Sequence, residues 1–133
     1  MPDDAPLPQA GTRTTVSRAE GATHDAGLRV FFTYRDLAIA GASGGAYGAN
    51  VIRAIPGVHA QPHWHTHELA FQMVFILKGW VKFEYADIGE VTLHPGDVVY
   101  QPPMVRHREV DHSDDLELVE ITSPAEFVTH VAE

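Results

Sequence analysis

Short runs of strand-forming residues, separated by turns rich in glycine and proline, divide the sequence from residue 28 onward. The runs cover residues 28–34, 46–55, 71–77, 80–85, 90–93, 98–101 and 116–121. Chains with many short strands and almost no helical periodicity fold as β-sandwiches or small barrels. The sequence therefore predicts an all-β domain.

The two ends of the chain differ from this pattern. Residues 1–26 are rich in Pro, Ala, Gly and Thr and contain few large apolar groups. This composition predicts a flexible N-terminal arm ahead of a single domain at residues 27–133. Near the other end, the segment from Ser123 to Glu126 has the form of a helix capping box, with proline at the first helical position. We therefore expect a short C-terminal helix.

The charge balance and the absence of cysteine exclude several functions. The chain has 18 acidic and 9 basic residues, a formal net charge of −9, and no Lys/Arg cluster. Nucleic acids and anionic membrane surfaces attract positive charge, so we expect neither as a partner. The sequence contains no secretory signal and no run of the roughly 20 apolar residues that span a membrane, and we expect a cytoplasmic protein. Without cysteine, any metal must be held by His, carboxylate or amide groups.

His63, His65 and His67 alternate with Trp64 and Thr66. Side chains two residues apart in a strand project to the same face, so the three imidazoles would point together. Neutral imidazole is the commonest metal ligand in proteins, and three imidazoles on one face do not suit a packed core. The spacing indicates a metal site, although an exposed histidine-rich turn would show the same pattern.

Two longer patterns make the chain resemble the cupin superfamily. The first cupin motif is matched by His65-x-His67-x4-Gln72-x6-Gly79, with Gln72 where cupins more often have glutamate. The second is matched by Gly96-x5-Pro102-x-Met104-x2-His107-x3-Asp111, with Met104 in place of a glycine and Asp111 in place of an asparagine. The resemblance covers about residues 46 to 122. It implies a double-stranded β-helix, which is the cupin or jelly-roll barrel.

The resemblance also implies that His65, His67, Gln72 and His107 hold one divalent transition metal. These ligand types leave Fe, Mn, Ni, Co, Zn and Cu open. A glutamine in the set keeps an oxygen ligand but removes one negative charge, so a divalent ion would be a stronger Lewis acid. Two alternatives stay open. A motif register shifted by two residues would put His63 in the place of His65, and Gln72 could be a polar core residue that binds its neighbours instead of a metal.

The predicted substrate-pocket residues are His63, Tyr100, Met104 and Arg53. Met104 would narrow the mouth of the site, and Arg53 and Tyr100 would bind an anionic group. Glu68 and Glu120 are candidate general bases if they face the pocket. The remaining histidines have no partner at ligand spacing and are expected at the surface; they include His24, His94, His112 and His130.

A cupin fold does not identify the reaction, because function depends on the site. The resemblance to single-barrel cupin oxygenases predicts a metal-dependent enzyme that carries out a dioxygenase-type oxidation of a small organic substrate. The ligand spacing H-x-H-x4-Q also resembles that of small cupins of pectin degradation, which implies a non-redox ring opening or isomerisation of a sugar or uronate. The third hypothesis is a non-catalytic protein that binds a small molecule.

The run at residues 71–77 also predicts how the chain assembles. Alternation from Gln72 sends Val74 and Ile76 inward and leaves Phe75 and Leu77 outside. A second sheet or a second subunit could cover these outer side chains. We therefore expect a homodimer.

Overall fold

The computed structural model of the protein describes residues 13–132, so residues 1–12 of the predicted arm lie outside the described residues. Residues 13–24 form no helix or strand. At the end of the predicted arm, Asp25–Ala26 forms strand β1 and pairs with β2.

The described residues form an almost entirely β structure, as the turn pattern predicts. The strands are β1 (Asp25–Ala26), β2 (Phe32–Asp36), β3 (Gly48–Ala54), β4 (His65–Glu68), β5 (Phe71–Lys78), β6 (Val81–Tyr85), β7 (Gly89–Leu93), β8 (Val98–Tyr100), β9 (His107–His112), β10 (Glu117–Ser123) and β11 (Val128–Val131). The single helix within residues 13–132 is α1 (Ile39–Ala42). No helix in this part of the chain has the length and apolar character needed to cross a membrane.

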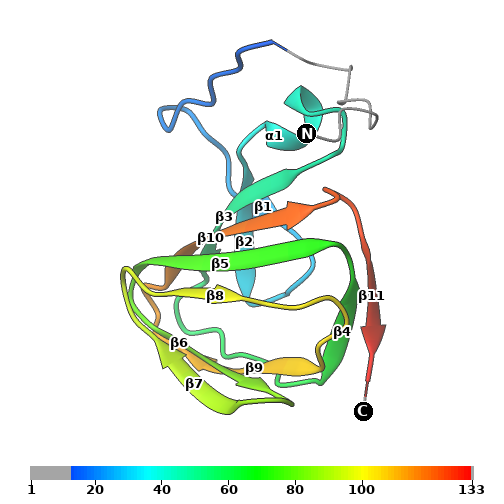
Figure 1. Ribbon diagram of the computed structural model, residues 1–133. Coiled ribbons are helices and arrows are strands. Elements are labelled where there is room, and N and C mark those ends of the chain that lie inside the picture. The colour runs from blue at the N-terminus through cyan, green and yellow to red at the C-terminus, as the bar shows by residue number, and fades with distance from the viewer. Residues whose placement is uncertain (1–12, 133) are drawn as a thin grey trace.

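Two antiparallel sheets face each other and form the barrel (Figure 1). The larger sheet has the strand order β1-β2-β3-β10-β5-β8, and the smaller has the order β11-β4-β9-β6-β7. Strands far apart in sequence are therefore neighbours: β10 lies between β3 and β5, and β9 lies between β4 and β6. This pairing brings residues near 65, 107 and 120 to the inside of one barrel.

The core follows the alternation of the strands. In β5, Val74 and Ile76 are buried, whereas Phe75 and Leu77 are exposed, which confirms the predicted faces of this strand. In β6, Val81, Phe83 and Tyr85 are buried and alternate with partly exposed Lys82 and Glu84. Side chains from both sheets form one hydrophobic cluster; its members include Phe31, Phe32, Ile52, Val74, Ile76, Val81, Phe83, Leu116 and Leu118.

Gly79, the hairpin glycine of the first motif, joins β5 to β6 in a backbone conformation with φ of 72°. L-residues with a side chain adopt positive φ only at a cost. A Cβ at this position would also lie 3.0 Å from Leu116 Cα. The glycine is thus required by the turn and by the close approach of the segment after β9.

The predicted C-terminal helix is wrong. The segment after β10 instead continues into strand β11, which pairs with β4 and runs along the side of the barrel (Figure 1). The capping pattern expresses only a local preference for helix. As a strand, the tail forms backbone hydrogen bonds with β4, whereas a helical tail would leave the backbone groups at the edge of β4 without these partners. The tail thereby covers the edge of the strand that carries His65 and His67.

Candidate metal centre and cavity

Three histidines meet inside the barrel. His65 and His67 lie two residues apart on β4, and His107 begins β9, where it pairs directly with His65. All three are buried. Each offers a ring nitrogen, and these nitrogens all lie within 4.8 Å of one another. The alternation of histidines on one strand therefore brings two imidazoles to the inner face, and the neighbouring strand supplies the third.

The Nδ1 atoms of these rings are held by hydrogen bonds on the side away from the cluster. His65 Nδ1 lies 2.9 Å from the carbonyl oxygen of His63, and His107 Nδ1 lies 2.9 Å from that of Val105. A carbonyl only accepts, so both Nδ1 atoms carry the proton and both Nε2 atoms present a lone pair. His67 Nδ1 lies 2.8 Å from Thr129 Oγ1 of β11. Such partners fix ring orientation and are typical of metal-binding histidines.

Burial also keeps the cluster uncharged. It lowers the pKa of His65 to about 4 and that of His67 to about 3, and it lowers the pKa of His107 as well. The positive charge of Arg29 acts in the same direction on all three rings. At neutral pH the imidazoles are therefore neutral, which is the form that binds a metal.

Gln72 lies on the facing sheet and lines the same cavity as the three histidines. It is buried on β5, and its Nε2 donates a hydrogen bond to Glu120 Oε2 on β10 at 3.0 Å. The amide nitrogen is thereby engaged, and the amide oxygen is the atom left to bind a metal. Burial raises the pKa of Glu120, and the hydrogen bond from Gln72 partly offsets that rise.

A cavity of about 320 Å³ opens in front of the three histidines. Its volume lies at the lower end of the range for small-molecule sites. Its wall combines apolar side chains with a few polar ones. The polar and charged members are Arg29, Tyr34, Asn50, His65, His67, Gln72, Gln101, His107, Glu109 and Glu120. Glu120 thus faces the pocket as predicted for a candidate base, whereas Glu68 is exposed and pairs with His130 at 2.5 Å.

A β-bulge in β9 places a buried histidine behind Glu109, which lines the cavity. The register of β6 against β9 passes from Lys82↔Asp111 to Phe83↔Glu109 and skips Val110. Alternation from His107 already places Glu109 on the inner face, and the extra residue turns His112 to that face as well; both are buried. His112 was expected at the surface, and that prediction is wrong because alternation along β9 breaks at the bulge.

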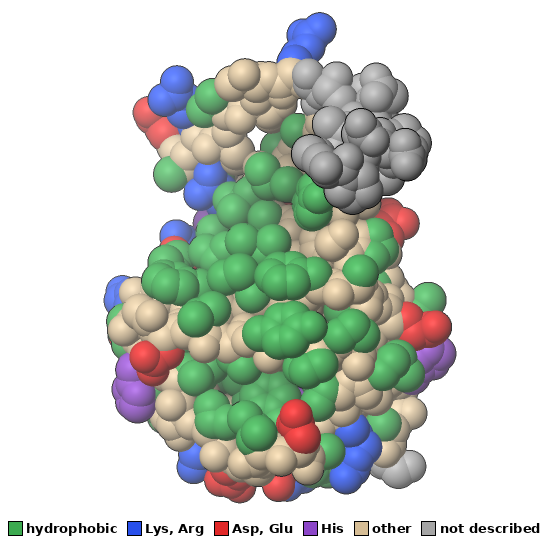
Figure 2. Space-filling view, in the orientation of Figure 1, with side chains coloured by type: hydrophobic (Ala, Val, Ile, Leu, Met, Phe, Trp, Pro, Cys, Tyr) green, Lys and Arg blue, Asp and Glu red, His purple; other side chains and the backbone are tan. Residues whose placement is uncertain are grey.

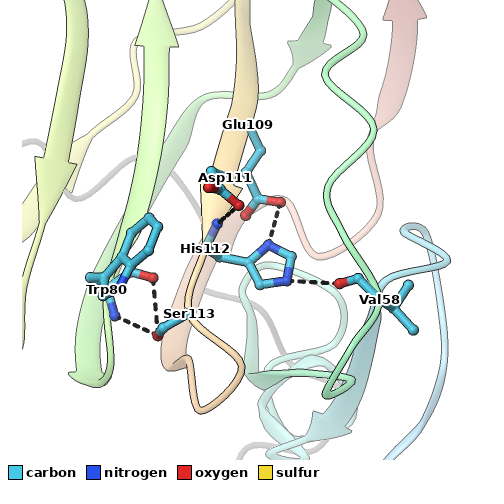
Figure 3. Close-up of polar contacts among 6 residues, drawn as sticks. All are labelled: Val58, Trp80, Glu109, Asp111, His112 and Ser113. Carbon is cyan, nitrogen blue, oxygen red and sulfur yellow. Dashed lines mark hydrogen bonds and ion pairs between the residues drawn. The ribbon is translucent and has the colours of Figure 1, made fainter.

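Glu109 and His112 form a buried ion pair, with His112 Nδ1 3.3 Å from Glu109 Oε2 (Figure 3). On its other side, His112 Nε2 lies 3.2 Å from the carbonyl oxygen of Val58 (Figure 3). Burial opposes a charge on His112, but the hydrogen bond to Glu109 and its charge outweigh burial and raise the pKa of His112. Burial raises the pKa of Glu109. The pair carries no net charge whichever group holds the shared proton.

Arg29 brings a positive charge into the same space. It lies between β1 and β2, lines the cavity, and its Nη2 contacts His65 Nε2. Because a guanidinium only donates, this contact again identifies His65 Nε2 as the atom with the lone pair. Tyr34 accepts a hydrogen bond from the backbone N–H of Arg29 at 3.1 Å, and this contact fixes the segment against β2.

The comparisons with known proteins agree with this architecture. The family model described as a cupin domain matches residues 50–122, which is more than half of the chain. The chain belongs to the cupin family. No curated protein matches it.

Solved cupin structures share the fold at low sequence identity. KdgF from Halomonas sp. superposes with a TM-score of 0.66 and 18% identity, over 84% of this chain and 96% of that one. A sugar phosphate isomerase of the cupin superfamily from Silicibacter pomeroyi gives 0.68 and 19%, over 90% and 82%. The structure named FeII HppE gives 0.64 and 14%, over 82% of this chain but only 60% of that one. At these identities the likeness concerns the fold.

The donor set of this cupin fits a transition metal. Three neutral imidazoles offer ring nitrogens within 4.8 Å of one another, and Nε2 of His65 and of His107 carries no proton. The amide of Gln72 lines the same cavity. Imidazole suits Zn, Cu, Fe and Ni, and the chemistry does not choose among them. His65, His67 and His107 are thus the residues that would hold the ion, with Gln72 as the fourth candidate.

The residues predicted for the substrate pocket lie elsewhere. His63, Arg53, Tyr100 and Met104 are absent from the cavity wall, and all four are exposed. The backbone carbonyl of His63 supports the site by accepting the hydrogen bond from His65 Nδ1. Arg53 forms an ion pair with Glu117 at 3.5 Å on the outside of the barrel. The cavity beside the three histidines is therefore lined by other residues than these four.

Sequence reasoning missed the residues that take their place. Arg29 and Tyr34 precede the cupin motifs, Glu109 follows His107 in β9, and its partner His112 is turned inward by the bulge. The available indication for Glu109 was its position two residues after His107, which puts it on the same face of an extended strand. No pattern in the sequence marked Arg29.

Proposed function

We propose that this cupin is a metal-dependent enzyme that acts on a small organic substrate inside the barrel. The proposal rests on the three buried imidazoles, whose ring nitrogens lie within 4.8 Å of one another and whose Nδ1 atoms are fixed from behind. A bound transition metal would polarise a substrate oxygen as a Lewis acid. The cavity of about 320 Å³ gives room for a substrate of roughly ten non-hydrogen atoms, on the basis that each water takes roughly 30 Å³.

Proton transfer is the reaction type that the side chains support best. Glu120 places a carboxylate in the cavity wall next to Gln72, where it can hold or move a proton at Oε2. Isomerisation and ring opening both need such a group together with polarisation of a substrate oxygen. The name of the sugar phosphate isomerase neighbour agrees with this class, although it is only 19% identical.

An oxygen-dependent oxidation is the second candidate. Among residues 13–132, the metal-binding cluster contains three histidines and no carboxylate, which would leave coordination positions open for ligands. A dioxygenase-type reaction requires such open positions. The structure named FeII HppE shows that a protein of this fold holds iron.

Elemental analysis of the purified protein tests the metal. We expect about one transition-metal ion per chain in the wild-type protein and in His94→Ala, since His94 is exposed and pairs only with Asp97. We expect loss of the ion in His107→Ala. A wild-type protein that neither contains nor takes up any of these metals would refute the proposal.

The two reaction classes differ in what they consume. Proton transfer predicts incorporation of solvent deuterium into a turned-over substrate without oxygen uptake, and loss of this exchange in Glu120→Gln. Oxidation predicts uptake in an oxygen electrode that depends on the bound metal. A metal-loaded protein that turns over neither class of compound would favour a binding protein.

We further infer that two copies of the chain pair through the outer face of β5 and β8. Hydrophobic side chains gather over these strands in Figure 2. They include Phe71, Phe75, Leu77, Val98 and Tyr100, which are between 37% and 55% exposed. Contiguous exposed apolar patches on soluble proteins mark interaction sites. β8 is the edge of its sheet, so a partner can approach without a clash with a further strand.

Light scattering tests the dimer. We expect twice the mass of the chain for the wild-type protein and the monomer mass for Phe75→Glu, because a charge at the centre of the apolar face opposes its burial. Ile88→Glu is the control, since Ile88 is 66% exposed in the turn between β6 and β7. A monomeric wild-type protein would contradict the pairing.

A further inference from the structure

The cavity wall contains a single cationic residue among the described side chains that line it, and this is Arg29. Its guanidinium contacts His65 and so lies beside the proposed metal ligands rather than at the surface. Glu120 is the one lining carboxylate without a cationic partner of its own, because Glu109 is paired with His112. Arg29 is therefore the group that decides the charge balance of the cavity.

Tyr34 provides a second hydrogen-bond donor next to Arg29. Its oxygen accepts the backbone N–H of Arg29 at 3.1 Å, and the hydroxyl proton remains to be donated. Burial raises the pKa of Tyr34 to about 12, so the proton stays on the oxygen at neutral pH. Tyr34 also lines the cavity. A guanidinium and a phenol on one wall are a suitable pair of donors for a carboxylate or another oxyanion.

The Arg29 side chain is able to turn towards a ligand. Arg29 donates to the Nε2 lone pair of His65, and a metal bound to His65 would occupy this same lone pair. Metal binding at His65 would therefore release the guanidinium from this contact. Its neighbours Leu28 and Val30 are 58% and 67% exposed, so their side chains do not pack around the guanidinium, while the backbone of Arg29 is held by Tyr34. The other N–H groups of the guanidinium are available in any case, because it carries five.

The net charge then favours an anion. The three histidines and Gln72 are neutral ligands, the Glu109–His112 pair carries no net charge, and Arg29 balances Glu120. A divalent ion would leave the cavity positive, which an anionic group of the substrate would neutralise. The rest of the wall carries no charge: Asn50 and Gln101 are polar, and Ile52, Val74, Phe83 and Leu118 are among the apolar side chains.

We propose that Arg29 and Tyr34 form the anion-binding end of the cavity, and that the substrate is a small organic acid with an apolar body. This inference rests on the proposed function, since it takes the cavity beside the three histidines as the substrate site. It reassigns the anion-binding role from Arg53 and Tyr100, which lie outside the cavity, to Arg29 and Tyr34, which line it.

Benzoate and benzamide are matched probes, because they have the same shape and differ in charge. Calorimetric titration of the protein as purified should give a Kd of about 1 mM for benzoate, a reasonable value for so small a ligand, and weaker binding of benzamide. Arg29→Gln should raise the Kd for benzoate by about tenfold or more and leave benzamide within about twofold, because it removes a charge-assisted hydrogen bond. Tyr34→Phe should weaken benzoate by about threefold through loss of one neutral donor.

Arg53→Gln is the control and should change neither Kd, since Arg53 lies outside the cavity. The proposal is overturned if wild-type protein binds benzoate no better than benzamide, if Arg29→Gln binds benzoate like the wild type, or if benzoate fails to bind at about 10 mM, well above the expected Kd. Tyr34→Phe decides the question if Arg29→Gln does not fold.

Metal content, measured on each sample, separates this failure from that of the proposed function. Bound metal with Arg29-independent binding of benzoate would leave the metalloenzyme proposal intact and refute the anion site. Arg29-dependent binding of benzoate in a protein that takes up no metal would support the anion site and refute the metalloenzyme.

Discussion

Gln72→Glu restores the carboxylate that cupins more often have in the first motif, and we expect it to destabilise the metal-free protein. Gln72 Nε2 lies 3.0 Å from Glu120 Oε2, so the substitution replaces a hydrogen-bond donor by a second negative oxygen at the same place. With an effective dielectric constant of about 20, two charges at about 3 Å repel by about 5 kcal/mol. Protonation of one carboxyl avoids this repulsion.

Protonation sets the size of the effect and its pH dependence. Holding a glutamate of ordinary pKa, about 4.3, in the protonated form costs about 3.7 kcal/mol at pH 7 but only about 1 kcal/mol at pH 5. The folded state of the variant binds a proton that the unfolded state releases above pH ~4.3, so its stability falls as the pH rises. We therefore expect a loss of about 3–4 kcal/mol at pH 7 and about 1 kcal/mol at pH 5, relative to wild type at each pH.

Urea unfolding of metal-stripped protein measures these losses. The double variant Gln72→Glu/Glu120→Gln is the matched control, because an amide at position 120 can donate to a carboxylate at position 72. It should lie within about 1 kcal/mol of the wild type at both pH values, the net contribution of an ordinary hydrogen bond. An equal loss at pH 5 and pH 7, or a double variant no more stable than the single one, would refute the electrostatic reasoning.

Three further predictions concern the barrel and the support of the site, with unfolding midpoints as the readout for stability. Gly89→Ala should lower the free energy of unfolding by about 1 kcal/mol, because of its positive φ alone. Gly79→Ala should lower it by about 3 kcal/mol, because its Cβ would also contact the segment after β9. Equal losses in the two variants would contradict the role of crowding. Ile76→Ala should cost about 3–4 kcal/mol, since Ile76 is fully buried, and a loss below about 1 kcal/mol would show that this core relaxes. Thr129→Val should weaken metal binding by about 10- to 100-fold in competition with a chelator, because His67 loses the hydrogen-bond partner of its Nδ1. Thr129→Ser keeps the hydroxyl and should retain the metal affinity. Equal affinity in both variants would contradict the role of the hydroxyl.

The sequence could predict those features that depend on regular strands. Alternation correctly placed Val74 and Ile76 inside and Phe75 outside, because β5 is regular in this region. The same rule failed in β9, where the skipped Val110 turns His112 inward. A bulge depends on how two strands pair, and the sequence of residues 107–112 contains no local signal that predicts it.

Features that depend on long-range pairing could not be predicted in this way. The segment after Ser123 has a good helix-capping sequence, yet it becomes β11 because the edge of β4 is available to it. No sequence pattern surrounds Arg29. This residue lies shortly before β2, and the pairing of β2 with β3 places it at the cavity. Motif spacing identifies candidate ligands in β4, β5 and β9, but the charge next to them comes from outside the motifs.

The topology explains why the site combines fixed and adjustable parts. The histidines lie on paired strands and are held at Nδ1 by backbone carbonyls or by Thr129, so their geometry follows from the barrel. Arg29 lies instead between β1 and β2, with an exposed residue on either side. A metal requires ligands that keep their place, whereas a substrate must enter and leave. The strands therefore supply the groups that must not move, and the segment before β2 supplies the one charge that is able to follow the ligand.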